Sequence, residues 1–193
     1  MYEGILIAGF GGQGVLSTGQ LLAYSGMVEG KHVAWIPSYG PEMRGGTANC
    51  GVTISDLPIS SPVVSEPTVL IAMNRPSLEK FENSVVKGGL IFVNSSLINI
   101  RSTREDVGVY YIPANDLAEE IGSSKVANNI ILGALLELTG VVSPGAIEKS
   151  LMDVLPPHHH KMIPINLKAL EAGAALVKTS GQQSEVSCQS TGL

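Results

Sequence analysis

The stretch Gly9-Phe10-Gly11-Gly12-Gln13-Gly14 follows an apolar run at residues 5–8 and precedes a segment of helical periodicity at residues 15–28. A buried strand, a tight glycine turn and a helix start, in this order, form a Rossmann-like βα unit. In such a unit the backbone N–H groups of the turn and of the first helical residues point toward a bound anion. The glycine spacing therefore predicts an anion-binding turn, and it also matches the dinucleotide fingerprint.

A nicotinamide dinucleotide site has a further requirement, an acidic residue at the end of the second strand that binds the adenosine ribose. The second strand is predicted over residues 32–36 and continues into Pro37, Ser38 and Tyr39, so that the first acidic residue is Glu42. No Lys-Ser/Thr pair follows Gly14, which excludes a P-loop. The turn thus favours a phosphate-bearing ligand other than NAD. A turn that needs glycine only for its shape is the alternative.

A second glycine-rich loop spans residues 38–46, Ser-Tyr-Gly-Pro-Glu-Met-Arg-Gly-Gly. It follows a strand of parallel type, and the carboxyl ends of parallel strands meet at one edge of a sheet, where ligands bind. We therefore expect the two loops to lie together. Arg44 suits a phosphate or a carboxylate, although an ordinary solvated arginine in a turn would fit the same pattern.

Strands are predicted near residues 5–8, 32–36, 47–55, 68–73, 90–93 and 107–112, and they alternate with helical segments. The apolar alternation in residues 47–55 is typical of an antiparallel or edge strand, so we expect a mixed, mostly parallel sheet. The fold class is a single three-layer α/β/α domain over residues 1–179. Residues 180–193 are polar in composition and are predicted to form a disordered C-terminal tail.

The composition limits the classes of function. Hydrophobic residues make up 44% and charged residues only 15% of the 193-residue chain, against roughly 25% charged residues in typical domains, so we expect part of the surface to face a partner. A net charge of −5 without a Lys/Arg cluster argues against nucleic acid. No apolar run reaches the ~18 residues of a membrane span, and no secretory signal pattern is present. We expect a cytoplasmic protein.

Other candidate residues favour structural roles. Cys50 is predicted to be a small core residue, and the run His158-His159-His160 a solvated loop, because three consecutive histidines cannot all face one metal. Asn115-Asp116 is predicted to cap a short helix, while Asn128-Asn129 is predicted to cap a long helix or to face a partner. The sequence shows neither a catalytic residue constellation nor a metal-ligand set.

Residues 9–15 and 38–50 together resemble the gamma subunit of 2-oxoacid:ferredoxin oxidoreductases. Shorter stretches at residues 72–77, 94–98, 112–115 and 125–128 are similar to the same family, so that the resemblance covers residues 3–178. The amino-acid sequence of residues 40–50 most resembles the branch of the family that uses 2-oxoglutarate (2-oxoglutarate synthase). Gamma subunits of the pyruvate (pyruvate synthase) or branched-chain 2-oxoacid enzymes are the alternatives within the family.

The resemblance implies an enzyme subunit that is not active alone. The assembled enzyme oxidatively decarboxylates a 2-oxoacid on thiamine diphosphate, passes electrons through iron–sulfur clusters to ferredoxin, and forms an acyl-CoA such as succinyl-CoA. Thiamine diphosphate and the clusters are held by partner subunits, alpha and beta and in some enzymes delta. The chain agrees with this division, because it has neither a Gly-Asp-Gly thiamine motif nor a Cys-x-x-Cys pair.

The gamma subunit helps to form the coenzyme A site. Carried over to this chain, the resemblance places on coenzyme A the residues Gly11, Gly12, Gln13, Gly14, Glu42, Met43, Arg44, Gly45 and Gly46. Their role is to hold the thiol close to the thiamine-bound intermediate. A free-standing dinucleotide-binding oxidoreductase, and a scaffold whose glycine loops only pack against partner subunits, are the rival hypotheses.

Overall fold

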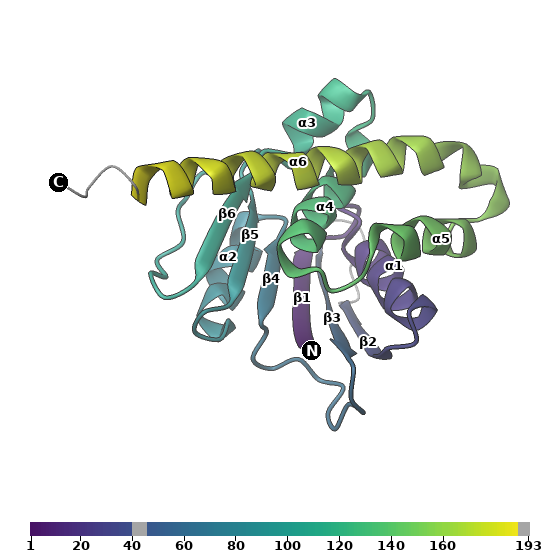
Figure 1. Cartoon of the computed structure of the whole chain (residues 1–193), viewed down its shortest axis with the longest axis horizontal. Helices are drawn as coiled ribbons and strands as arrows, with labels where there is room; N and C mark the ends of the chain where they lie inside the picture. Colours follow the sequence, from purple (N-terminus) through teal and green to yellow (C-terminus); the bar gives the residue numbers. More distant parts are fainter. Residues whose placement is uncertain (40–45, 189–193) are drawn as a thin grey trace.

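A six-stranded mixed sheet forms the centre of the molecule (Figure 1). The computed structural model describes the backbone of residues 1–39 and 46–188 and the side chains of residues 1–38 and 46–179. The strand order is β2-β3-β1-β4-β5-β6. The strands are β1 (Tyr2–Phe10), β2 (His32–Tyr39), β3 (Thr47–Ser55), β4 (Val69–Ala72), β5 (Leu90–Asn94) and β6 (Gly108–Ile112).

Strand β3 alone runs against the others. It pairs antiparallel with both β1 and β2, whereas β1, β4, β5 and β6 pair in parallel. Its inward residues Cys50, Val52 and Ile54 are fully buried, as the alternating pattern predicts, and the mixed, mostly parallel sheet is confirmed. Because β3 reverses the direction twice, β1 and β2 point the same way and both end at one edge of the sheet.

Helices cover the two faces of the sheet unequally. They are α1 (Val15–Val28), α2 (Arg75–Phe81), α3 (Ala114–Ile121), α4 (Ala127–Thr139), α5 (Pro144–Val154) and α6 (Ile163–Cys188), with 3₁₀ turns η1 (Glu82–Ser84), η2 (Ser124–Val126) and η3 (Pro157–Met162). Figure 1 shows α4, α5 and α6 in front of the sheet and α2 behind it. The α/β domain predicted from the sequence is confirmed.

Each face of the sheet has its own apolar core. On the face that carries α1 and α4, Ile7 and Phe92 pack with Leu22 and Ile131 in the larger cluster. On the opposite face, a smaller cluster joins strand residues to Leu78 of α2. Successive strand residues alternate between these clusters, which is the period-2 geometry of a sheet buried on both faces.

Helices α4 and α6 pack backbone against backbone. A β-carbon at Gly133 would overlap the carbonyl oxygen of Leu170, and one at Gly173 would overlap the carbonyl oxygen of Ile130. Only glycine allows so close an approach of two helices. Helix α6 thus lies firmly across the helical layer.

Helix α6 also extends further than expected. It continues to Cys188, past position 180, where the sequence predicts the start of a disordered tail. A helix already nucleated extends at little cost through residues that lack proline, and residues 181–188 contain one glycine and no proline. Residues 189–193 lie outside the described part of the chain, and the domain boundary at residue 179 stays a prediction.

The N-terminus of α3 is capped from a distant loop. The Oγ of Ser96 accepts hydrogen bonds from the backbone N–H groups of Asn115 and Asp116, both at 3.2 Å. The prediction that Asn115-Asp116 supplies the cap is therefore wrong. The side chain of Asn115 instead accepts a 2.8 Å hydrogen bond from Asn94, which ties α3 to the end of β5.

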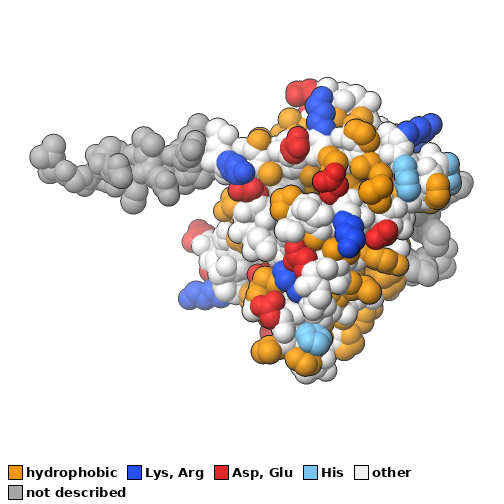
Figure 2. Space-filling view, turned by 45° about the vertical axis from the view of Figure 1, so that its right-hand side comes forward, with side chains coloured by type: hydrophobic (Ala, Val, Ile, Leu, Met, Phe, Trp, Pro, Cys, Tyr) orange, Lys and Arg blue, Asp and Glu red, His pale blue; other side chains and the backbone are white. Residues whose placement is uncertain are grey.

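No helix within the described residues combines the length and the apolar character that crossing a membrane requires. Figure 2 shows that, on the face in view, Lys and Arg side chains stand singly among hydrophobic and acidic ones. This distribution offers no basic track for a nucleic-acid backbone on that face.

Candidate functional site

The two glycine-rich loops meet at the carboxyl edge of the sheet. The N–H of Gly11 donates a 3.0 Å hydrogen bond to the carbonyl of Gly46, so the predicted neighbourhood of the loops is confirmed. A cavity of about 310 Å³ opens between them; its lining consists of Phe10, Gly11, Gly12, Gly14, Val15, Leu16, Ser17, Gly46, Thr47 and Ala48. We call it the glycine cavity.

Four of the ten residues that line the glycine cavity are glycines, so backbone groups are accessible there. Gly12 and Gly14 have φ angles of 98° and 77°, a left-handed conformation that favours glycine. Gly14 is the N-cap of α1, with no side-chain hydrogen bond at the cap. The first N–H groups of α1 consequently lack acceptors within the helix, and together with the helix dipole they favour an anion.

The side chain of Gln13 forms hydrogen bonds within the protein. Its Oε1 accepts from the N–H of Phe10 at 2.6 Å and from Asn74 Nδ2 at 3.3 Å, and its Nε2 donates to the carbonyl of Met73 at 3.2 Å. The side chain is turned inward and ties the first glycine loop to the end of β4. Gln13 is absent from the lining of the glycine cavity, and its assignment to coenzyme A stays a prediction.

Asn128 supports the first glycine loop from α4. Its Nδ2 donates to Thr18 Oγ1 at 2.9 Å, and Thr18 in turn donates to the carbonyl of Gly14 at 2.9 Å. A β-carbon on Gly14 would lie 2.7 Å from Asn128 Cγ. The prediction that Asn128-Asn129 caps its helix is wrong, because the N-cap is Val126. Asn129 is buried and its Nδ2 donates to Asn166 at 2.7 Å inside the protein, whereas Asn128 is half-buried and its alternative role, facing a partner, stays a prediction.

Cys50 lies behind the glycine cavity, beneath the start of α1. It is fully buried, and its Sγ contacts the carbonyl of Val15 at 3.4 Å. Burial raises the pKa of the thiol to about 11, although hydrogen bonds to Trp35 and Gly19 act in the opposite direction. Since the thiolate is the reactive form, Cys50 is an inert core residue, as predicted.

Two hydroxyl groups of the cavity were not predicted. Ser17 lies in the first turn of α1 and Thr47 directly follows Gly46; both are exposed and line the cavity. Their positions after the two glycine loops are the signal that could have identified them. Of the second loop, Gly46 lines the cavity, whereas Glu42, Met43, Arg44 and Gly45 lie outside the described residues.

The histidine run is a 3₁₀ turn, η3, in place of the predicted loop. Nε2 of His160 lies 2.8 Å from the carbonyl of Leu155, and the rings of His158 and His159 contact one another with centroids 4.2 Å apart. Within the described residues no three His, Cys, Asp or Glu side chains come together to hold a metal.

An α/β domain with an anion-suited glycine turn at the carboxyl edge of its sheet is a class that many enzymes share. Comparison with models of known protein families narrows the class of protein. Residues 4–176 match the family model of pyruvate ferredoxin/flavodoxin oxidoreductase. The chain belongs to this family, which confirms the resemblance seen in the sequence.

Among curated relatives, the ketoisovalerate oxidoreductase subunit VorA of Methanothermobacter marburgensis is 43% identical over 173 residues, which cover 88% of this chain and 35% of VorA. The chain thus spans about a third of that relative's length. The 2-oxoglutarate synthase subunit KorC of Methanocaldococcus jannaschii is 35% identical over 181 residues, which cover 92% of this chain and 95% of KorC.

Two solved structures share the fold. The gamma subunit of a keto/oxoacid ferredoxin oxidoreductase from Geobacter sulfurreducens superimposes with a TM-score of 0.76 at 30% identity, covering 90% of this chain and 96% of its own. The 2-oxoglutarate:ferredoxin oxidoreductase from Magnetococcus marinus, with 2-oxoglutarate, coenzyme A and succinyl-CoA bound, gives a TM-score of 0.82 at 26% identity, covering 92% of this chain and 31% of that one.

Proposed function

We propose that this chain is the gamma subunit of a 2-oxoacid:ferredoxin oxidoreductase and that its glycine cavity binds part of coenzyme A. The observation that carries the proposal is the junction of the two glycine loops, where the Gly11–Gly46 hydrogen bond joins an anion-suited helix start to the loop of Arg44. The bound coenzyme A and succinyl-CoA in the Magnetococcus marinus relative support it.

The size and chemistry of the cavity fit one portion of that ligand. At about 310 Å³, the cavity is at the lower limit of small-molecule sites, so it suits a phosphate-bearing portion more than a whole coenzyme A. The first backbone N–H groups of α1, with the hydroxyls of Ser17 and Thr47, would serve as donors. Arg44 would add the positive charge that the described lining lacks.

The proposed reaction is the oxidative decarboxylation of a 2-oxoacid to an acyl-CoA, with ferredoxin as electron acceptor. Alpha and beta subunits would hold thiamine diphosphate and iron–sulfur clusters, and coenzyme A would supply the thiol that accepts the acyl group. This chain would bind and orient coenzyme A, which replaces a random encounter by an oriented, near-unimolecular one. A cytoplasmic location is part of the proposal, and the free thiol of Cys50 suits a reducing compartment.

We favour 2-oxoglutarate as the substrate, because the similarity to KorC extends over nearly its full length. The higher identity to VorA and the similarity to a gamma subunit common to pyruvate and ketoisovalerate oxidoreductases in Thermococcus litoralis support a branched-chain 2-oxoacid or pyruvate as the alternative. Initial-rate assays of the assembled enzyme with the three 2-oxoacids distinguish these substrates.

Arg44→Ala in the assembled enzyme tests the coenzyme A site. The expected result is a rise in KM for coenzyme A of about tenfold or more, the effect of losing one charge-assisted contact, with KM for the 2-oxoacid nearly unchanged. Arg75→Ala is the matched control, because Arg75 lies on α2 and pairs with Glu79 on the exposed surface. Equal changes in both KM values would contradict the proposal, and unchanged coenzyme A kinetics would support the scaffold hypothesis.

A further inference from the structure

A second and larger hollow lies on the helical side of the molecule, between α4, α5 and α6. It has a volume of about 710 Å³, and residues of these three helices, of the loop between α4 and α5, and Glu29 line it. We call it the helical groove. It shares no lining residue with the glycine cavity, so the site proposed above does not account for it.

The floor of the helical groove is apolar. Leu136 of α4, Ile147 of α5, and Leu167 and Leu170 of α6 supply large side chains. Alanine and glycine residues, among them Ala174, stand between them and leave the space open. An open apolar floor of this size is typical of a surface that receives apolar side chains from a partner.

The rim of the helical groove is acidic, because its lining contains four glutamates and a single cationic residue, Lys178. Two of the glutamates have partners in the same chain: Glu137 lies 3.1 Å from Lys178 Nζ, and Glu29 lies 2.9 Å from Lys31 Nζ. Glu148 on α5 and Glu171 on α6 form neither a salt bridge nor a side-chain hydrogen bond with any described residue. These two carboxylates stand on opposite walls of the groove.

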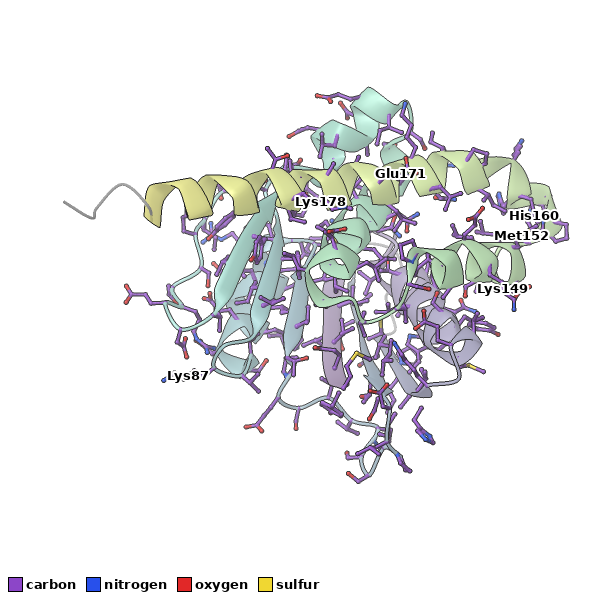
Figure 3. The ribbon with its side chains drawn as sticks, in the orientation of Figure 1. Lys87, Lys149, Met152, His160, Glu171 and Lys178 are labelled. Carbon is purple, nitrogen blue, oxygen red and sulfur yellow. The ribbon has the colours of Figure 1, made fainter. Side chains whose placement is uncertain are left out.

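The neighbouring cation on α5 does not neutralise the rim. Lys149 is absent from the lining of the groove, and in Figure 3 its side chain lies on the side of α5 away from α6, whereas Glu171 and Lys178 are seen along α6. In a chain with only 15% charged residues, two exposed carboxylates without partners that flank an apolar floor favour a cationic occupant.

The charge and shape of the groove narrow the choice of occupant. Coenzyme A, acyl-CoA and 2-oxoacids are anions, which the acidic rim repels. The α6 wall from Leu167 to Lys178 is about 16 Å long at 1.5 Å per residue, the length of three turns of helix. Helix-in-groove docking uses apolar anchors at i, i+3 or i+4, and i+7 over that length.

We propose that the helical groove docks an amphipathic helix of a partner subunit, whose apolar face fills the floor and whose Lys or Arg side chains meet Glu148 and Glu171. This inference rests on the part of the proposed function that makes the chain a subunit, but not on coenzyme A binding. The relatives in which this domain is about a third of the chain support the presence of further protein around it.

The first test reverses the charge of both walls in the assembled enzyme. The double substitution Glu148→Lys/Glu171→Lys raises the dissociation constant between this chain and the other subunits at least about tenfold, since like charges then face each other across the interface. The matched control is Glu119→Lys/Glu120→Lys, an equal change of charge at exposed positions on α3 outside the groove. Mass photometry of dilution series measures the dissociation constants of the groove variant and of the α3 control.

Coenzyme A kinetics separate this inference from the proposed function. In the assembled fraction of the groove variant, KM for coenzyme A stays within about twofold of the wild-type value, because the groove and the glycine cavity share no lining residue. Assembly of the groove variant as tightly as the α3 control would overturn the inference. A changed KM with unchanged assembly would overturn it as well.

Two further measurements test the occupant itself. Ala174→Trp fills the groove without changing charge, and it weakens assembly while thermal unfolding shows that the chain still folds. A photoreactive p-benzoylphenylalanine at position 171 of the assembled enzyme crosslinks to a partner peptide that carries Lys or Arg between apolar residues three or four positions apart. Crosslinks to a second copy of this chain, or to a peptide without a basic residue, would overturn the inference.

Discussion

The glycine cavity and the helical groove are both open hollows, but different chemical groups line them. The glycine cavity lies at the carboxyl edge of the sheet and presents backbone N–H groups and two hydroxyls, with no charged side chain in its described lining. The helical groove lies among α4, α5 and α6 and presents leucine and isoleucine side chains under an acidic rim. One therefore suits an anion and the other an apolar segment with positive charge.

The difference also determines which substitutions each hollow tolerates. A surface made of backbone depends on glycine, since a side chain there strains the turn or closes the space. A surface made of side chains tolerates exchange of its residues but depends on the helices that carry them. Substitutions at glycines of the two regions, and at the groove rim, should therefore have effects of different size and cause.

The largest effect is expected at the helix contact that carries the groove floor. Gly173→Ala places a β-carbon onto the carbonyl of Ile130 and forces α4 and α6 apart, which lowers the free energy of unfolding by about 3 kcal/mol. Urea unfolding measures this loss. The control is Gly145→Ala, also in a helix of the groove but with open space around its β-carbon; a comparable loss there would show that close packing is not the cause.

A smaller effect is expected at the glycine cavity. Gly14→Ala combines a φ of 77° with contact to Asn128 and should cost about 2 kcal/mol of unfolding free energy. Gly12→Ala, with a φ of 98° but no neighbour within 4 Å of its β-carbon, should cost about 1 kcal/mol by backbone strain alone. Chemical denaturation of both variants and of Gly14→Ala/Asn128→Ala separates the two causes; equal losses at both glycines would exclude the contact with Asn128.

The effect expected at the groove rim is no larger than that of Gly12→Ala at neutral pH and becomes the smallest at low pH. Burial opposes ionisation of Glu29, but hydrogen bonds from Lys31 and Ser143 outweigh it and lower the pKa to about 2. A folded-state pKa below the unfolded one stabilises the protein above the unfolded pKa, so this contribution is complete at neutral pH and is lost as pH falls from about 4.3 toward 2.

Glu29→Gln should consequently cost about 1 kcal/mol at pH 7, a value that allows for solvent screening of a partly exposed ion pair, and almost nothing near pH 2. Thermal unfolding between pH 2 and 7 follows the difference. Glu148→Gln is the control, because Glu148 forms no ion pair with a described residue, and it should leave the unfolding temperature unchanged. A difference between wild type and Glu29→Gln that grows toward low pH would contradict the assigned pKa.

Local patterns in the sequence were sufficient to predict much of the sheet. The alternation in β3 predicted an antiparallel or an edge strand, and β3 is antiparallel but lies inside the sheet. The parallel strands that precede the two loops predicted that both loops lie at one edge, which the Gly11–Gly46 hydrogen bond confirms. These predictions succeeded because strand direction and glycine turns depend on neighbouring residues. The site residues themselves stay predictions, since Glu42 to Gly45 lie outside the described residues.

Predictions failed where a polar side chain had a choice of partners. Asn129 donates to Asn166, and Asn115 accepts from Asn94, in each case a residue at least 21 positions away. The sequence does not indicate such partners, because they depend on how the elements pack. The helical groove could not be predicted for the same reason, since its walls come from three helices, two of which, α4 and α6, approach closely through Gly133 and Gly173.

Helix α4 reaches from a residue that supports the first glycine loop to the wall of the helical groove. Near its start, Asn128 contacts Gly14 through Thr18, and near its end Leu136 and Glu137 line the groove, about 12 Å further along the axis. A hydrogen-bonded helix hardly stretches, so a sliding displacement of α4 moves both ends by the same amount. Helix α4 therefore couples the position of Asn128, and through it the first glycine loop, to the wall of the helical groove.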